Sequence, residues 1–484
     1  MENRLLNQLS SFDSWKRVDA LQTLAATTRF PEEVAAMNMH VHSFFSYNGE
    51  GWSPSRIAYE MRKMGLHGAA LCDFDVIQGV NEFLVAGDLL GLRTAASFES
   101  RVFFPEYADK EINSPGEPGV FYFMGSGYVD GSHSYLFQEQ LEQSHKRNRE
   151  LIDRVNAALP GCRISYEEHV LPLTPDRNAT ERHIVRAYYD LAAREHGDAA
   201  SAARFWAEVF GEEASVLAGK SPNAMNDYLR SKLMKKGGLG YEQPTQETFP
   251  PIDQVIKLIR SCRALPNAAW LDGSLPGEAN PREQLECLVA KGLEMVNIIP
   301  DRNWNFKDAE KKAIRVKALN EYVAAANELD LPIIVGTECN KPGQRTVDDF
   351  DADALKPLMK DFTRGADVLF GHTTLLRYAD YSYIDQRAKE EFPSRKARND
   401  FFASVGALPV PSVATRLYLR LCGPEKKEDR RQHRDDSDPY CLLLRILEAD
   451  AGTKSAAPPK VKTLKIELEG LYFAVFPLND FQVS

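Results

Sequence analysis

Apolar and polar residues along the first hundred positions predict strands that alternate with helices. Residues 1–36 carry apolar side chains at roughly helical spacing, which predicts an N-terminal helical segment. Three short apolar runs follow, and each of them ends in polar residues. The polar ends are His42, Asp73 and Glu99, and the helices predicted between the runs cover 55–64 and 79–90. This order is typical of a β/α fold, in which functional groups gather at the carboxyl ends of strands.

The same alternation returns in the second half of the chain. The predicted helices cover 252–264, 281–291 and 308–329, and the predicted strands cover 268–271, 295–299 and 331–336. Residues of about 140–235 have a mostly helical pattern, which indicates an inserted helical subdomain. The pattern therefore predicts an α/β domain over 37–385 that contains this insertion.

The alternation fades after residue 385, and we expect a partly flexible C-terminal extension over 386–484. Residues 425–438 mix five basic and six acidic side chains, which is typical of a solvated stretch. Residues 449–459 are a candidate linker, and residues 461–476 alternate like a strand.

Composition indicates a globular cytoplasmic protein. A chain of 484 residues can bury a full core, and its net charge of −10 gives no signal for binding nucleic acid or an anionic membrane surface. No apolar stretch is long enough to span a bilayer, and the first residues lack the apolar core of a signal peptide. The seven cysteines are scattered without a C-x-x-C pair, which favours reduced thiols.

The segment His40-Val41-His42 is the first candidate for chemistry. Residues i and i+2 of a strand point to the same side, so both imidazoles can face one point in space. Two neutral imidazoles at a strand end form half of a site for Zn, Mn or Fe. The alternative is a pair of hydrogen-bonded structural histidines, and the pattern alone does not decide between them.

The order of further motifs resembles the PHP (polymerase and histidinol phosphatase) superfamily of metal-dependent phosphoesterases. The likeness is greatest to its branch that hydrolyses nucleoside bisphosphates and short RNA, and it covers about residues 37–345. The matching segments, with the family pattern in parentheses, are His40-Val41-His42-Ser43 (H-x-H-S), Asp73-Phe74-Asp75 (D-H-D), Ser97-Phe98-Glu99 (G-I-E), Arg182-His183-Ile184 at the start of the insertion, Ala269-Trp270-Leu271 (A-H-P) and Thr337-Glu338-Cys339-Asn340 (S-D-x-H).

The resemblance implies a distorted PHP-type (β/α)7 barrel with a helical insertion, a C-terminal extension and a site for a divalent metal, Zn, Mn or Fe. The metal ligands that it implies are His40, His42, Glu99, His183, Glu338 and Asn340. Glu99 would also act in catalysis together with Asp73. The implied activity is hydrolysis of a small-molecule phosphate ester by a metal-activated water.

Three positions depart from the family pattern. Phe74, Trp270 and Asn340 stand where the family has histidine, and an aromatic hydrocarbon ring cannot ligate a metal. We therefore expect one or two ions and not a three-metal centre. Phe74 and Trp270 either fill the space of lost histidines or form a stacking surface for an aromatic ligand.

Cationic residues near the predicted strand ends are candidates for binding the phosphate. Arg302 and Arg345, with Lys341 beside them, would face the site, and guanidinium groups clamp phosphate with two hydrogen bonds. Each of them can instead be an ordinary solvated side chain. His372 ends an apolar run that resembles a strand, so it is either a replacement ligand or a hydrogen-bonded structural histidine.

Three functions remain open at this point. The first is a PHP-type phosphoesterase, and the second is a binding or scaffold protein whose barrel has lost catalysis. The third is a metal-dependent hydrolase of another bond, such as a C–N bond. The first requires a stoichiometric metal and activity on phosphate esters, and the second predicts that alanine at His40 or Glu99 leaves ligand or partner binding intact. Substrate profiling separates the first from the third.

Overall fold

The computed structural model describes residues 2–159 and 161–412. The predicted charge run over 425–438, the candidate linker over 449–459 and the predicted strand over 461–476 lie outside the described residues. None of the described helices is both long and apolar enough to cross a membrane.

Seven strands form one sheet whose spatial order follows the chain. They are β1 (Val34–Val41), β2 (Leu66–Phe74), β3 (Arg93–Phe103), β4 (Val120–Ser126), β5 (Leu265–Trp270), β6 (Met295–Ile298) and β7 (Ile333–Val335). The end of β1 pairs with the segment after β7, because His42 N donates to Glu338 O (2.9 Å) and Glu338 N donates to His40 O (2.8 Å). This pairing closes the sheet into a distorted seven-stranded α/β barrel, so the predicted fold class is confirmed.

Strand β4 departs from the expected parallel barrel. It runs antiparallel to both of its neighbours, β3 and β5, while the other adjacent strands are parallel. The connection from β3 to β4 holds only the 3-10 helix η1 (Pro105–Tyr107), with no α-helix to carry the chain back across the sheet. The alternation pattern predicted no strand over 120–126, so it did not reveal this reversal.

Five helices around the barrel lie where the pattern predicts them, within a few residues. They are α3 (Pro54–Lys63), α4 (Val80–Leu90), α10 (Ile252–Ser261), α11 (Pro281–Lys291) and α13 (Ala309–Glu328), and the pattern did not predict the short α12 (Asp301–Trp304). Their ends follow local chemistry. The Ser53 side chain accepts from Arg56 N at the start of α3, and Gly91 ends α4 in the left-handed conformation at φ 66°.

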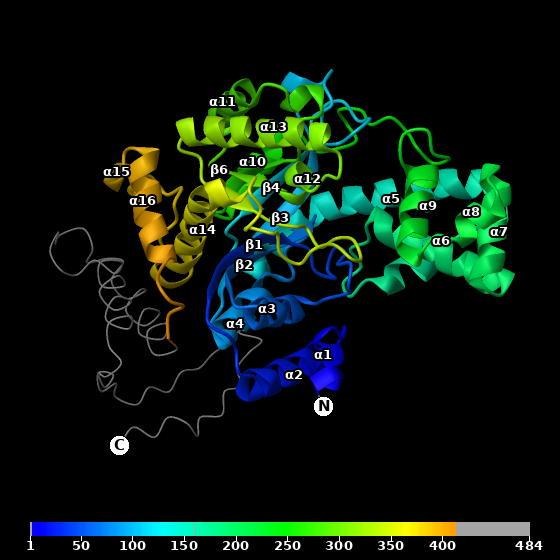
Figure 1. Cartoon of the computed structure of the whole chain (residues 1–484), viewed down its shortest axis with the longest axis horizontal. Coiled ribbons are helices and arrows are strands. Elements are labelled where there is room, and N and C mark those ends of the chain that lie inside the picture. The colour runs from blue at the N-terminus through cyan, green and yellow to red at the C-terminus, as the bar shows by residue number, and fades with distance from the viewer. Residues whose placement is uncertain (1, 160, 413–484) are drawn as a thin grey trace. The chain divides into compact units, whose positions relative to one another are not determined.

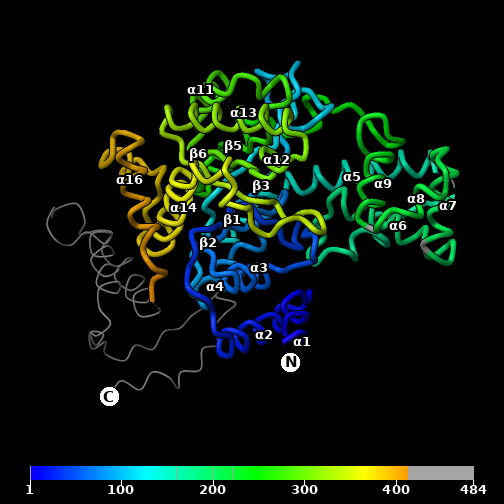
Figure 2. The backbone as a smooth tube through the Cα atoms, in the orientation of Figure 1, coloured from blue at the N-terminus to red at the C-terminus, as the bar shows by residue number. Residues whose placement is uncertain are grey.

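Two helices precede the barrel, α1 (Glu2–Leu9) and α2 (Ser14–Thr27), and they pack beside α3 and α4 (Figure 2). A nearly buried ion pair fixes them, since Arg17 Nη2 lies 2.6 Å from Glu82 Oε2 on α4. The helical pattern predicted over 1–36 is thus confirmed up to Thr27, and β1 begins at Val34.

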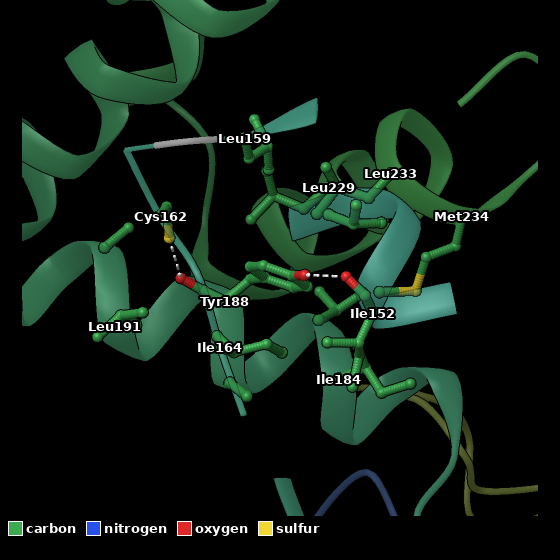
Figure 3. Packing of buried hydrophobic residues seen from close by; sticks show 14 of the residues in the cluster. Ile152, Leu159, Cys162, Ile164, Ile184, Tyr188, Leu191, Leu229, Leu233 and Met234 are labelled. Atoms are coloured by element: carbon green, nitrogen blue, oxygen red, sulfur yellow. Dashed lines mark hydrogen bonds between the residues drawn. The ribbon is translucent and has the colours of Figure 1, made fainter. Parts of the chain in front are cut away.

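A helical insertion lies between β4 and β5 and extends to one side of the barrel (Figure 1). Its helices are α5 (Gln138–Ala158), α6 (Glu181–His196), α7 (Ala199–Phe210), α8 (Ala214–Ala218) and α9 (Pro222–Met234). They enclose an apolar core of their own, in which Tyr188 and Leu229 are fully buried (Figure 3). The Tyr188 hydroxyl donates to Asn156 Oδ1 (2.8 Å), so this buried polar group is satisfied.

The described chain ends in three helices, α14 (Met359–Ala379), α15 (Gln386–Glu391) and α16 (Arg395–Gly406). The strand predicted to end at His372 is wrong, because this residue lies within α14. Helix α14 is buried on several sides, and Gly365 and Gly371 let it approach β7 and α16 closely. A short apolar run cannot distinguish such a buried helix from a strand.

Candidate metal centre

Three buried side chains meet at the carboxyl end of β1, where Glu99 lies within β3 opposite the last residue of β2. His40 Nε2 and His42 Nε2 are 3.2 Å apart, and they lie 3.6 Å and 3.4 Å from Glu99 Oε2. The two histidines are adjacent on one side of β1, and β2 alone separates that strand from β3. Within residues 2–159 and 161–412 this is the one group of three His, Cys, Asp or Glu side chains whose ligand atoms lie this close.

The triangle has the size of one face of a tetrahedral metal site. Ligand atoms about 2.0–2.1 Å from a tetrahedral ion lie about 3.3 Å from one another. The three observed separations of 3.2, 3.4 and 3.6 Å bracket that value. His40, His42 and Glu99 therefore fit one ion with three protein ligands and a fourth position open.

The charge of the site favours a cation. Glu99 is 3% exposed, and its Oε2 has no hydrogen-bond partner among the described residues although two imidazoles face it. A buried carboxylate oxygen without a partner is costly, and a metal ion at the centre of the triangle would satisfy it. Burial raises the pKa of Glu99, but His40 and His42 outweigh it and lower the pKa to about 2.

Hydrogen bonds fix the tautomer of His42. Ser46 Oγ donates to Asp73 Oδ1 (2.6 Å), so its single hydrogen is used and the same oxygen can only accept from His42 Nδ1 (3.2 Å). His42 therefore carries its proton on Nδ1 and turns the Nε2 lone pair toward Glu99. This is the orientation that a metal-ligating imidazole needs.

His40 has a comparable support in Asn297 on β6. The side-chain amide of Asn297 lies 3.1 Å from His40 Nδ1. Asn297 Oδ1 is buried and no described residue donates to it. Rotating the amide by half a turn satisfies this oxygen with the His40 Nδ1–H and leaves the Nε2 lone pair for a metal. Burial lowers the pKa of His40, but Glu99 outweighs it and the net direction is upward.

Asp73, which the resemblance assigns to catalysis, lies behind the triangle and not in it. Its oxygens accept from Ser43 N (2.8 Å), Ser43 Oγ (2.7 Å) and Ser46 Oγ (2.6 Å), and the residue is 1% exposed. Burial raises the pKa of Asp73. This position supports His42 through Ser46 and gives Asp73 a positioning function.

The two aromatic departures have different surroundings. The Phe74 ring stacks on His42 at 4.5 Å between centroids and so covers one face of that imidazole. Trp270 is 1% exposed and stacks on Tyr322 at 4.5 Å. Trp270 therefore fills the core, and it offers no surface to an aromatic ligand.

His183 is buried at the start of α6 and lies outside the triangle. Its Nδ1 accepts from Thr180 N (3.1 Å), so a neutral ring carries its proton on Nε2 and has no free lone pair there. Burial lowers the pKa of His183 to about 3. His183 would have to change its hydrogen bonding before it could ligate a metal.

The remaining predicted residues lie in the segments after β6 and β7. Glu338 is turned by a left-handed backbone (φ 67°) and its carboxylate lies 3.5 Å from Arg302 Nη2. Arg345 pairs with Asp301 at 3.6 Å and lies over the Trp304 ring, and Asn340 is half-buried outside the triangle. The structure thus pairs Arg302 with a predicted ligand but turns Arg345 to other partners.

His372 does not replace a lost ligand. It is fully buried, its Nε2 donates to Gly127 O (3.1 Å), and its Nδ1 accepts from Tyr383 N (3.3 Å). Both nitrogens are used, and burial lowers its pKa to about 4. The hydrogen-bonded structural interpretation of His372 is confirmed.

Sequence reasoning missed Arg101, which follows Glu99 by two residues on β3 and so shares its face. Its guanidinium lies 3.5 Å from Glu117, 3.8 Å from Glu181 and 4.5 Å from the centroid of the Phe249 ring. Burial opposes its charge, but neighbouring anionic groups outweigh this and raise its pKa. The spacing Glu-x-Arg on a strand was the available signal.

No family model matches this chain, and no curated protein matches it significantly. One solved structure similar to it is a protein from Bifidobacterium adolescentis described as a metal-dependent phosphoesterase, with 18% identity, 69% of this chain and 98% of that chain covered, and a TM-score of 0.41. Another is an amidohydrolase from Chromobacterium violaceum with bound sulfate, with 14% identity, 65% and 91% covered, and a TM-score of 0.45.

Proposed function

We propose that the chain is a metal-dependent hydrolase of the PHP type whose substrate is a small phosphate ester. The observation that carries the proposal is the buried triangle of His40, His42 and Glu99, with its unpaired carboxylate oxygen. A divalent metal held there supplies Lewis acidity, which lowers the pKa of water and polarises a phosphoryl oxygen. With three protein ligands the triangle resembles catalytic sites, because structural zinc sites use four.

The chain's own residues hold the ligands in the required protonation state. Ser46 and Asp73 keep the proton of His42 on Nδ1, and Asn297 contacts the corresponding nitrogen of His40. Glu99 stays ionised at neutral pH because its pKa is about 2. The site is therefore organised to bind a cation without first losing a proton from the carboxylate.

Positive charge near the triangle favours an anionic substrate over a neutral one. Arg101 lies on the same face of β3 as Glu99, and Arg302 lies beside Glu338 with about half of its side chain exposed. Guanidinium groups can bind two phosphate oxygens at once. This arrangement favours a phosphate ester as the substrate over the alternative, a compound with a hydrolysable C–N bond.

A second candidate function is a binding protein whose barrel keeps a metal but not catalysis. The near-complete burial of the three ligands favours it, since a substrate must reach the open coordination position. Phe74 lies over His42 and is the side chain that would have to move. The two candidates agree on metal binding and differ in turnover.

The test combines metal loading with a panel of phosphate esters and amides. Wild-type protein should hydrolyse a phosphate ester in a metal-dependent manner, and His42→Ala should lose that activity. His67→Gln is the matched control, because it removes another histidine that contacts carboxylates. Metal binding without turnover on any ester would refute the hydrolase, and turnover of amides alone would shift the assignment to C–N bonds.

A further inference from the structure

A polar cavity lies between the helical insertion and two loops of the barrel. The cavity is narrow and partly open to solvent. The polar side chains that line it are Tyr47 from the loop after β1, Arg182 on α6, Asn223, Asn226 and Arg230 on α9, and Lys341 from the loop after β7. None of them belongs to the candidate metal triangle.

The lining is cationic even after its neighbours are counted. Asp227 lies between two of the lining cations, 2.7 Å from Arg182 Nη1 and 2.8 Å from Lys341 Nζ. Two carboxylate charges, those of Asp227 and Glu181, therefore face the three lining cations.

Glu181 also forms ion pairs with cations that do not line the cavity. Its carboxylate is 2.8 Å from Arg230 Nη2 and also 2.8 Å from Lys235 Nζ, with Arg101 at 3.8 Å. Each carboxylate is thus shared by at least two cations. The cluster keeps an excess of positive charge, and the described lining residues include no acidic side chain to offset it.

One polar atom on the lining residues lacks a partner. Asn226 Oδ1 is buried, and nothing in the described ranges donates a hydrogen bond to it. A buried amide oxygen without a donor costs about 1–3 kcal/mol, and a half-turn of the amide would instead present two N–H donors at the same place. Both orientations are explained by a ligand that offers hydroxyl and oxyanion groups together.

We infer that this cavity binds a phosphate-type oxyanion. The three lining cations exceed the two carboxylates by one, which favours an anion, and two guanidinium groups, an ammonium and two amides provide the planar and point donors that phosphate oxygens use. The site goes beyond the proposed hydrolase, since its residues and the metal ligands are different. It is nevertheless adjacent, because Tyr47 follows Ser46, which contacts His42.

The test is direct binding of inorganic phosphate to the full chain by isothermal titration calorimetry. The titration is made in chloride buffer with the protein as purified, and again after chelation, so that binding at the metal triangle is separated. Wild-type protein should bind phosphate saturably in both states. Arg230→Gln should lower the affinity at least tenfold, and so should Asn226→Asp, which preserves the size of the side chain but adds a negative charge.

The control is Arg282→Gln, which removes an arginine that is ion-paired on the outer helix α11. It should bind phosphate like the wild type. Circular dichroism verifies that each variant is folded. If Arg230→Gln does not fold, the phosphate affinity of Asn226→Asp alone tests the inference. Absence of binding in wild-type protein, or equal affinities in all folded variants, would overturn the inference.

A second titration with glycerol phosphate identifies the source of the anion. Binding of the ester as strong as that of free phosphate, and weakened by Asn226→Asp, shows that the cavity takes a phosphoryl group of a larger molecule. Binding of free phosphate alone shows a site for the inorganic ion. Either result supports phosphate binding in the cavity. Neither titration requires turnover at the metal triangle, so the inference is tested independently of the proposed hydrolase.

Discussion

Histidines meet carboxylates at both ends of the barrel, and the two clusters differ in geometry. At the carboxyl ends of the strands, two imidazole nitrogens lie 3.4–3.6 Å from one carboxylate oxygen. At the amino ends, His67 on β2 lies 2.6 Å from Glu33 and 2.7 Å from Asp367, one carboxylate for each ring nitrogen. The first cluster leaves a buried oxygen unpaired, whereas every ring nitrogen in the second is used.

This difference separates a site built for a cation from an ion pair built for structure. At 2.6–2.7 Å the protons of a charged His67 fill the space between ring and carboxylates, and no metal fits. At 3.4–3.6 Å the hydrogen bonds are too long, and the spacing suits an ion bound between the atoms. The residue types are alike, so distance and hydrogen-bond use carry the distinction.

The largest expected effect comes from Glu99→Gln. The metal contributes several kcal/mol to stabilising the transition state, so its loss should lower kcat/KM for a phosphate ester at least about 1000-fold. Glu33→Gln, at the other end of the barrel, should leave kcat/KM within a few-fold of the wild type. Steady-state kinetics on metal-loaded proteins measure both, and equal losses in the two variants would remove the contrast between the clusters.

The next effect concerns the support behind His42. Ser46→Ala removes the acceptor that keeps the proton of His42 on Nδ1, and such supports are worth about 10–100-fold in metal affinity. Competition with a chromophoric chelator measures the change. Ser132→Ala, in an exposed turn, is the control. An unchanged affinity in Ser46→Ala would show that the tautomer of His42 is not what prepares the triangle.

Two arginines of β3 sharpen the comparison between the ends of the same strand. Arg101→Gln should raise KM for a phosphate ester about tenfold without loss of metal, since a charged hydrogen bond contributes about 1.5–3 kcal/mol. Arg93 pairs with Glu33 at 2.6 Å at the amino end, so Arg93→Gln should lower stability and leave KM unchanged. A raised KM in Arg93→Gln with an unchanged KM in Arg101→Gln would instead place the substrate at the amino ends of the strands.

The smallest effect is a pH dependence at His67. Burial lowers its pKa, but hydrogen bonds to Asp367 and Glu33 outweigh it and the net shift is upward. A raised folded-state pKa stabilises the fold at pH values below the unfolded pKa, and this stability is lost as the pH rises through the folded pKa. Because Glu33 is about half exposed, we expect only about 1 kcal/mol.

Thermal unfolding of wild type and His67→Gln from about pH 5.5 to pH 9 measures this contribution. The stability difference between the two proteins should be largest at the acidic end of the range and should shrink as the pH rises. A difference that grows with pH would mean that His67 acts as a neutral hydrogen-bonding residue and not as half of an ion pair.

The sequence predicted best those features that depend on residues close to one another along the chain. The alternation of strands and helices predicted six of the seven strands, and the family resemblance implied six metal ligands, of which His40, His42 and Glu99 lie together in the triangle. The antiparallel strand β4 and the helix around His372 were not predicted, because a short apolar run has no periodicity that distinguishes a strand from a helix.

Contacts over long sequence distances could not be predicted from one chain. The use of His67 depends on Asp367, 300 residues further along, and the orientation of His40 depends on Asn297. The protonation of His183 depends on a backbone N–H that becomes its partner only when α6 begins at Glu181. Such hydrogen bonds decide which nitrogen is free, and spacing in the sequence does not report them.

The most direct test of the central claim is the metal content of purified protein, measured by inductively coupled plasma mass spectrometry. Wild type and His67→Gln should each contain about one equivalent of a transition metal, and Glu99→Gln should contain almost none. Metal-free wild type that takes up no Zn, Mn or Fe on dialysis, or equal metal content in all three proteins, would contradict the assignment of His40, His42 and Glu99.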